Sequence, residues 1–133
     1  MSKRVGGGSY QSVDLLDEEE VVDGQQARYG DSLFRARGKL FLTNRRLIFC
    51  PVKNWIGLSV PPIALELERI TAIGRQRGGW ITKLFILGQN ADSWFVEVDG
   101  RRHWFDLGSG WNEMWMERFA DRLGLTAAEV KER

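Results

Sequence analysis

Hydrophobic and polar residues alternate with a period of two over much of the middle of the chain, which is typical of β-strands with one buried face. Two apolar, β-favouring runs at 39–43 and 46–50 are separated by the dipeptide at 44–45, and this spacing predicts a hairpin. Apolar residues occupy every second position over 63–67, and a further short run covers 70–74. The pattern therefore predicts a series of short antiparallel strands.

An Asp-Gly dipeptide at 99–100 fixes the register of a second hairpin over 93–107. Asp-Gly is among the strongest signals for a two-residue turn, and closing the turn there pairs Phe95 with Trp104. The Phe95–Trp104 pair then lies on the outer face, whereas His103 lies on the apolar face that we expect to be the core side.

From residue 111 onward the hydrophobic period changes from two to that of an α-helix. The residues expected on the buried stripe of this helix are Trp111, Met114, Trp115, Phe119 and Leu123. Gly124 suits the position after the helix, and a capping-box pattern at 126–129 predicts a second, short helix. The fold class expected is mainly β, a partly open barrel of about seven antiparallel strands capped by an amphipathic C-terminal helix.

The chain is expected to form one domain, because 133 residues suffice for one hydrophobic core and are too few for two ordinary ones. Residues 1–12 are rich in Gly and Ser and predict a flexible N-terminal arm. The domain is expected over 13–124, followed by a short C-terminal helix or tail over 125–133.

Composition and charge exclude several classes of protein. The chain has 19 Lys and Arg against 18 Asp and Glu, a formal net charge of +1, which disfavours a generally basic nucleic-acid binder. One cysteine excludes a disulfide framework and a Cys-rich zinc site. No apolar run approaches the roughly 20 residues of a membrane span, and no signal peptide is evident. We expect a cytoplasmic protein, with peripheral membrane association as one possibility.

Charge is segregated along the chain although the total is near zero. Residues 14–23 hold six carboxylates and no cation, whereas residues 28–53 hold seven cations and the single carboxylate Asp31. The acidic run at 17–20 is interpreted as a solvated surface. The basic stretch is the part that an anionic partner would meet.

The sequence Gly-Lys-Leu-Phe-Leu-Thr-Asn-Arg-Arg-Leu-Ile-Phe over 38–49 resembles the signature hairpin of the GRAM domain family. The stretch 60–73, the hairpin 94–107 and the helix from Trp111 are similar to later elements of that family. The resemblance covers roughly residues 19 to 123. It implies a pleckstrin-homology-like barrel that binds membrane lipids, often phosphoinositides or phosphatidylserine, or that serves as a protein-interaction module.

In such a barrel, cations in the loops at the open end can hold phosphates by charge-assisted hydrogen bonds. The candidate headgroup ligands are Arg35, Arg37, Lys39 and Lys53. The alternative is a solvated loop whose cations face the acidic segment 14–23. Arg45 and Arg46 fall at the opposite, turn end of the hairpin, where we expect them to serve the fold.

A second candidate is a loop in which a tryptophan beside two glycines is flanked by cations, as at a membrane interface. Its residues are Arg75, Arg77, Trp80 and Lys83. The alternative packs Trp80 onto the barrel and leaves the loop as a basic connector. Trp55 permits the same two interpretations.

No pattern in the sequence indicates catalysis, a metal site or a cofactor. His103 and Cys50 both fall inside predicted strands, where a hydrogen-bonded core histidine and an unreactive buried thiol are expected. The leading hypothesis is a non-enzymatic module that recognises an anionic membrane lipid. The alternative is a protein-binding or self-assembling scaffold that uses a strand edge or the outer Phe95–Trp104 face.

Overall fold

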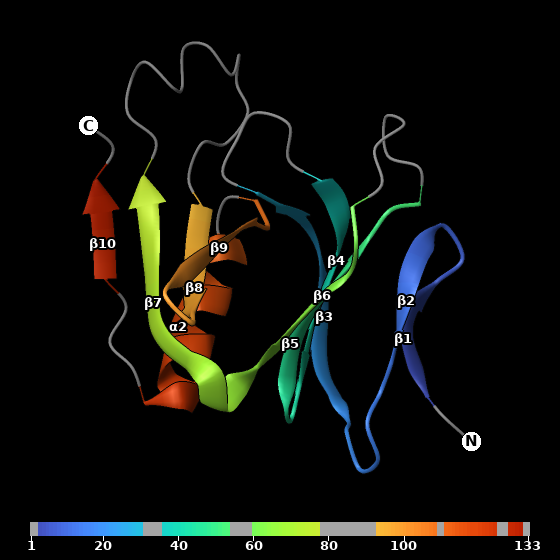
Figure 1. Cartoon of the computed structure of the whole chain (residues 1–133). Coiled ribbons are helices and arrows are strands. Elements are labelled where there is room, and N and C mark those ends of the chain that lie inside the picture. The colour runs from blue at the N-terminus through green and yellow to red at the C-terminus, as the bar shows by residue number, and fades with distance from the viewer. Residues whose placement is uncertain are drawn as a thin grey trace.

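The computed structural model describes residues 3–30, 36–53, 60–77, 93–108, 111–124 and 128–131. Its main feature is an eight-stranded sheet in the order β10-β7-β8-β9-β3-β4-β5-β6 (Figure 1). The strands are β3 (Val21–Tyr29), β4 (Ala36–Thr43), β5 (Arg46–Pro51), β6 (Ile63–Glu66), β7 (Ile70–Arg77), β8 (Ser93–Val98), β9 (Arg101–Asp106) and β10 (Ala128–Lys131). The seven strands from β3 to β9 pair antiparallel, and β6 and β10 are left at the two ends of the order, so the sheet is a partly open barrel.

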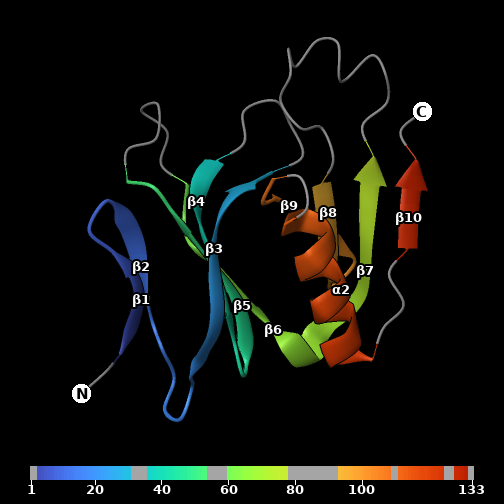
Figure 2. The same cartoon turned by 180° about the vertical axis from the view of Figure 1, so that it is seen from behind.

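The sheet bends so that its two halves enclose one core. Strands β3 and β9 pair at the corner between the halves, where Tyr29 lies opposite Phe105. The α-helix α2 (Trp111–Leu123) covers the β7–β8 half, and a short 3-10 helix η1 (Leu67–Arg69) links β6 to β7 (Figure 2). The largest fully buried side chains include Trp94, Phe49 and Phe119. The strand-then-helix architecture predicted from the sequence is confirmed.

Both predicted hairpins have the expected register. Leu42 lies opposite Leu47 across the turn at 44–45. Phe95 lies opposite Trp104 across the Asp99-Gly100 turn, whose residues have φ of 53° and 76° as this turn type requires. However, Phe95 is only 2% exposed and Arg102 lies 4.4 Å above its ring, so the Phe95–Trp104 face is not the open surface that a scaffold would need.

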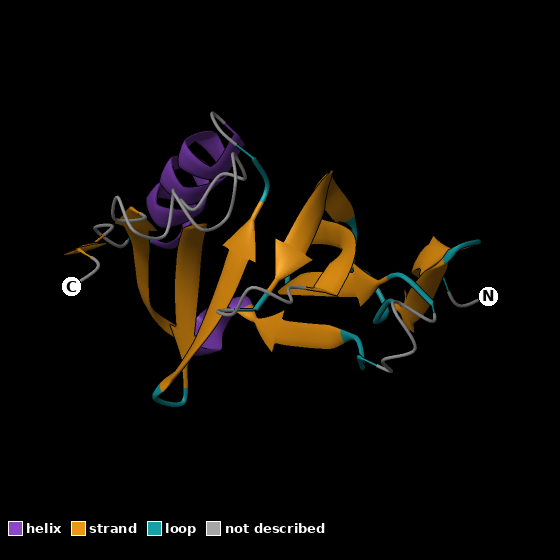
Figure 3. Ribbon diagram, turned by 90° about the horizontal axis from the view of Figure 1, so that it is seen from above, coloured by secondary structure: helices purple, strands orange, loops and turns teal. Residues whose placement is uncertain are grey.

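The N-terminal residues form a hairpin instead of the flexible arm predicted over 1–12. Its strands are β1 (Arg4–Gly7) and β2 (Tyr10–Asp14), and the hairpin packs beside β5 on the outer side of the barrel (Figure 3). The physical reason lies in β5, which is apolar on both faces. Phe49 faces the main core, while Ile48 and Cys50 face outward and are buried together with Val5 of the hairpin.

The helix α2 is rotated relative to the prediction. Trp111 and Met114 are 46% and 38% exposed, whereas Trp115 is buried. The rotation has a cause in the first turn, because the side chain of Asn112 is buried, accepts a hydrogen bond from the backbone N–H of Leu107 at 2.5 Å and turns the neighbouring tryptophan outward.

Two further expectations near the chain's C-terminal half are corrected. The capping-box segment contributes strand β10, not a short helix, and β10 pairs parallel with β7. The strand expected over 70–74 extends to Arg77, so the predicted loop begins later. The extension matters because it supplies the backbone groups to which β10 binds. None of the helices in the described part of the chain is long and apolar enough to span a membrane.

Candidate ligand-binding site

The connections between the strands lie at two opposite ends of the barrel. The turn at 44–45, the helix η1 and the turn at 99–100 lie at one end, which we call the turn end. Strand β3 leads out of the sheet at the other end, as do β5 and β7, and this end is uppermost in Figure 1. We call it the loop end. The predicted headgroup ligands Arg37 and Lys53 belong to this second end.

A hollow of about 290 Å3 lies on the outer side of β3 and β4 near the loop end. Two arginines, one carboxylate and a tyrosine are among its lining residues, with Leu107 and Gly108 of the β9–α2 link at one side. Its lining residues include Tyr10, Gln26, Arg28, Arg37, Val52 and Asp106. A volume of this size is at the small end of the range for small-molecule sites.

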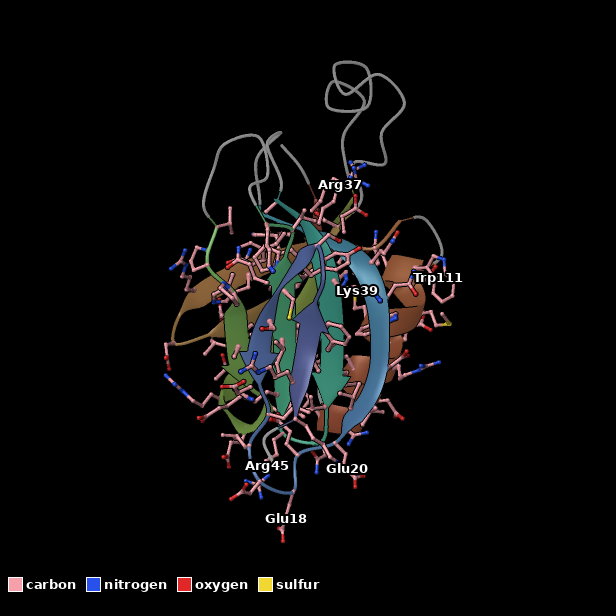
Figure 4. The ribbon with its side chains drawn as sticks, turned by 90° about the vertical axis from the view of Figure 1, so that its right-hand side faces the viewer. Glu18, Glu20, Arg37, Lys39, Arg45 and Trp111 are labelled. Carbon is pink, nitrogen blue, oxygen red and sulfur yellow. The ribbon has the colours of Figure 1, made fainter. Side chains whose placement is uncertain are left out.

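The strand register brings the cations of this hollow together. Arg28 on β3 lies directly opposite Arg37 on β4, and Gln26 lies opposite Lys39 in the same pairing. Because side chains two residues apart share a face, all four belong to one outward-facing patch, while the intervening Ala27 is buried in the core. Figure 4 shows Arg37 and Lys39 in the upper half of the molecule. We call these four residues the basic patch.

The N-terminal hairpin forms one wall of the patch. Tyr10 forms a β-bridge with Val52, which places its side chain beside β4 and β5. The ammonium group of Lys39 lies 5.9 Å from the centroid of the Tyr10 ring and 5.9 Å from that of Phe41. Cation–aromatic contacts of this length hold a lysine in place without neutralising its charge.

Asp106 forms the opposite wall, and it is held rigidly. Its carboxylate is buried and accepts hydrogen bonds from the backbone N–H of Gly108 at 2.9 Å and from the amide of Asn112 at 2.8 Å. Asp106 is also the register partner of Arg28 on β9. Arg28 therefore has an arginine on one neighbouring strand and a carboxylate on the other.

Like charges directly opposite each other in an antiparallel pair are destabilising. The Arg28–Arg37 pair is partly offset by the Asp106 carboxylate opposite Arg28, and Lys39 adds a third cation on the same face. Arginine guanidinium groups present several donors in a plane and suit phosphate oxygens in particular. The arrangement is chemically suited to an anion that carries phosphate or carboxylate groups.

The predicted headgroup ligands are only partly brought together. Arg37 and Lys39 share the basic patch, and Lys53 lies one residue beyond Val52, with its backbone N–H donating to Ser9 at 2.9 Å and its side chain exposed. Arg35 lies outside the described residues. Neither Lys39 nor Lys53 forms an ion pair with a described carboxylate.

The sequence interpretation missed Arg28, Gln26 and Tyr10. Arg28 could have been found from its position in the basic stretch had the pairing of β3 with β4 been inferred. Tyr10 carried no usable signal, because its segment was interpreted as a flexible arm.

Only the first part of the second predicted site, the membrane-interface loop, lies in the described residues. Arg75 and Arg77 have their backbone in β7, and strands β8, β9 and β3 lie between β7 and β4 in the sheet order. Trp80 and Lys83, like Trp55, lie outside the described residues. Their proposed membrane contact stays a prediction.

The turn end carries a different kind of charge cluster. Glu19 is only 2% exposed, and its carboxylate accepts hydrogen bonds from Arg46 Nε at 2.9 Å, Arg46 Nη2 at 2.7 Å and the Thr43 hydroxyl at 2.6 Å. The run at 17–20 is thus not wholly a solvated surface as interpreted. Arg46 serves the fold, as predicted.

His103 and Cys50 occupy the environments expected of them. The Tyr29 hydroxyl lies 2.8 Å from His103 Nδ1, and burial together with the nearby charge of Arg101 lowers the pKa of His103. Burial raises the pKa of the Cys50 thiol to about 11. Within the described ranges no group of three or more His, Cys, Asp or Glu side chains could hold a metal ion.

No protein-family model matches the chain, and no curated protein sequence matches it significantly. Solved structures do match. The hSac2 domain of the human phosphoinositide phosphatase Sac2 aligns with a TM-score of 0.60 at 13% identity, over 90% of this chain and 80% of that one. The N-terminal PH domain of Vps36 aligns with a TM-score of 0.58 at 18% identity, over 87% and 86%.

The chain has a pleckstrin-homology-like fold. This fold agrees with the partly open barrel and the covering helix α2 described above. A domain of an unknown protein from Leishmania infantum also aligns, with a TM-score of 0.56 at 13% identity over 80% of this chain and 86% of that one. Fold alone does not determine what such a domain binds.

Proposed function

We propose that this PH-like domain is a non-enzymatic binding module of the GRAM type that recognises anionic lipid headgroups at a membrane surface. The observation that carries the proposal is the basic patch, in which Arg28 and Arg37 face each other beside a hollow of about 290 Å3. The GRAM-like hairpin at 38–49 supports the family assignment, and it supplies one of the patch's four residues, Lys39.

Several features favour a lipid headgroup over a neutral ligand. The patch combines two guanidinium groups and an ammonium group on one side of the sheet, and the hollow has room for a phosphorylated headgroup. Each cation near an anionic membrane surface contributes about 1 kcal/mol to binding. A structural neighbour is named as a domain of a phosphoinositide phosphatase, which supports phosphoinositides as the first lipid class to test.

The test is co-sedimentation of the purified chain with vesicles of phosphatidylcholine alone, with added phosphatidylserine, or with added phosphoinositide. We expect binding to the anionic vesicles only, and the variants Arg37→Glu and Lys39→Glu should each lower affinity by about 10- to 30-fold, since each reverses one charge near the surface. Arg45→Glu is the matched control, because Arg45 is an exposed cation at the turn end.

Equal recovery of wild-type protein with neutral and anionic vesicles would overturn the proposal. So would an equal loss in the Arg45→Glu variant, because it would show that net charge, and not the basic patch, determines binding. In either case a protein ligand becomes the better hypothesis, as the PH-like fold allows.

A further inference from the structure

The exposed hydrophobic side chains of the described residues fall into two groups. Leu16, Val21 and Val22 lie near the turn end, where Leu16 borders a hollow with Asn44 and Arg45. Trp111 and Met114 lie on the first turn of α2, at the loop end of the barrel. The second group is the one next to the basic patch.

The chain connects Trp111 directly to the hollow. Leu107 and Gly108 line the hollow, and the carbonyl of Gly108 accepts the hydrogen bond that begins α2, from the N–H of Asn112 at 3.0 Å. Figure 4 shows Trp111 in the same half of the molecule as Arg37 and Lys39, pointing away from the protein beyond β3. An apolar projection and a cationic hollow thus occupy neighbouring positions.

The outward position of Trp111 is imposed by the structure. The buried Asn112 side chain binds Asp106 and Leu107 and sets the rotation of the first turn. Asp106 is the same carboxylate that forms a wall of the hollow. The residue that shapes the hollow therefore also presents the tryptophan.

We propose that Trp111 and Met114 form a membrane anchor that enters the interface of an anionic bilayer while the basic patch holds a lipid headgroup. Trp is favoured at membrane interfaces because its ring is apolar and its N–H is polar. The cations of the adjacent patch complement the negative surface, which selects a bilayer as the occupant of this exposed surface. The inference rests on the proposed function, to which it adds a second, apolar contact.

The experiment separates the two contacts. Vesicles containing phosphoinositide report both, whereas a soluble inositol phosphate, measured by calorimetry, reports the headgroup contact alone. We expect Trp111→Ser to lower vesicle affinity by about 10- to 100-fold. The variant lacks the large aromatic surface, nearly half of it exposed, that the wild type would bury in the bilayer on binding. The affinity of this variant for inositol phosphate should equal that of the wild type.

Matched variants test the position of the anchor. Met114→Ser should weaken vesicle binding in the same direction, and Leu16→Ser, an equally exposed apolar residue at the turn end, should leave it unchanged. In a second measurement, brominated lipids should quench tryptophan fluorescence of the bound wild type, and Trp111→Phe should remove part of that quenching.

The outcomes distinguish the anchor from the headgroup site. If the wild type binds anionic vesicles and Arg37→Glu abolishes this, but Trp111→Ser behaves like Leu16→Ser, the anchor is refuted and the lipid-binding function stands. If Trp111→Phe is quenched as strongly as the wild type, the anchor is also refuted. If the wild type binds neither vesicles nor inositol phosphate, the proposed function itself fails.

Discussion

The replacement Glu19→Gln removes one negative charge from the buried cluster at the turn end while preserving the size of the side chain. In the native protein, hydrogen bonds from Arg46 are the largest influence on Glu19 and outweigh the effect of burial, with further bonds from Thr43 and from the backbone N–H of Leu16. Together they lower the pKa of Glu19 from 4.5 to about 2. The ionised carboxylate is therefore part of the folded state.

The size of the effect follows from that change in pKa. A fall from 4.5 to about 2 corresponds to about 3 kcal/mol of folding free energy, at about 1.36 kcal/mol per pH unit. Because the folded-state pKa is the lower one, this contribution is complete above pH 4.5 and is lost as the pH falls toward 2. Glu19→Gln should lose about 3 kcal/mol at pH 7, since Arg46 keeps its charge but loses the buried carboxylate that pairs with it.

The assay is urea unfolding of wild type and Glu19→Gln at pH 7 and pH 3. The difference in free energy of unfolding between the two proteins should shrink by about 2 kcal/mol at the lower pH, because only the wild type carries this titrating group. Glu20→Gln is the control, since Glu20 is exposed. A difference that does not change with pH, or a variant as stable as the wild type, would refute the reasoning.

Two further substitutions test the packing. Gly38→Ala should destabilise the fold by about 2 kcal/mol or more in thermal unfolding, because a Cβ there would clash with the Cys50 carbonyl oxygen. Gly24→Ala should cost clearly less, because the nearest atoms to its Cβ would belong to the Phe41 ring at 3.0 Å, and equal losses would contradict the geometry. Trp115→Ala should cost about 3–5 kcal/mol in urea unfolding, whereas Met114→Ala should change stability by less than about 0.5 kcal/mol. Large losses in both variants would instead agree with the helix rotation expected from sequence, which buries both side chains.

Features set by neighbouring residues could be predicted from the sequence. The Asp99-Gly100 turn fixes the pairing of Phe95 with Trp104, because a shift by one residue would exchange the two faces of the hairpin. The hairpin at 39–50 followed from the same kind of local signal. The alternation of hydrophobic residues then predicted a sheet covered by a helix. A sheet with one apolar face must bury that face against another element, and α2 is the only long helix in the described part of the chain.

Features that depend on distant contacts could not be predicted in this way. The rotation of α2 depends on the buried polar residue Asn112. The free-energy cost of burying its side chain is offset by hydrogen bonds with Asp106 and Leu107. A hydrophobic pattern assigns such a residue to the surface and its neighbour Trp111 to the core. Glu19 was assigned to the surface for the same reason, since its partner Arg46 is 27 residues away.

The basic patch depends on the N-terminal hairpin in a way that links stability to binding. Ile48 and Cys50 give β5 an apolar outer face, which β1 and β2 cover, and the same hairpin carries Tyr10 to the edge of the patch beside Lys39. The apolar outer face of β5 is therefore the reason that the hairpin encloses one side of the hollow. Without the hairpin, Arg28 and Arg37 would lie on an open sheet, where water screens their attraction for an anion. Gly6, which has a positive φ and lies close to Cys50, lets the hairpin pack against β5. The proposed binding surface on β3 and β4 therefore depends on the geometry of a segment that precedes both strands.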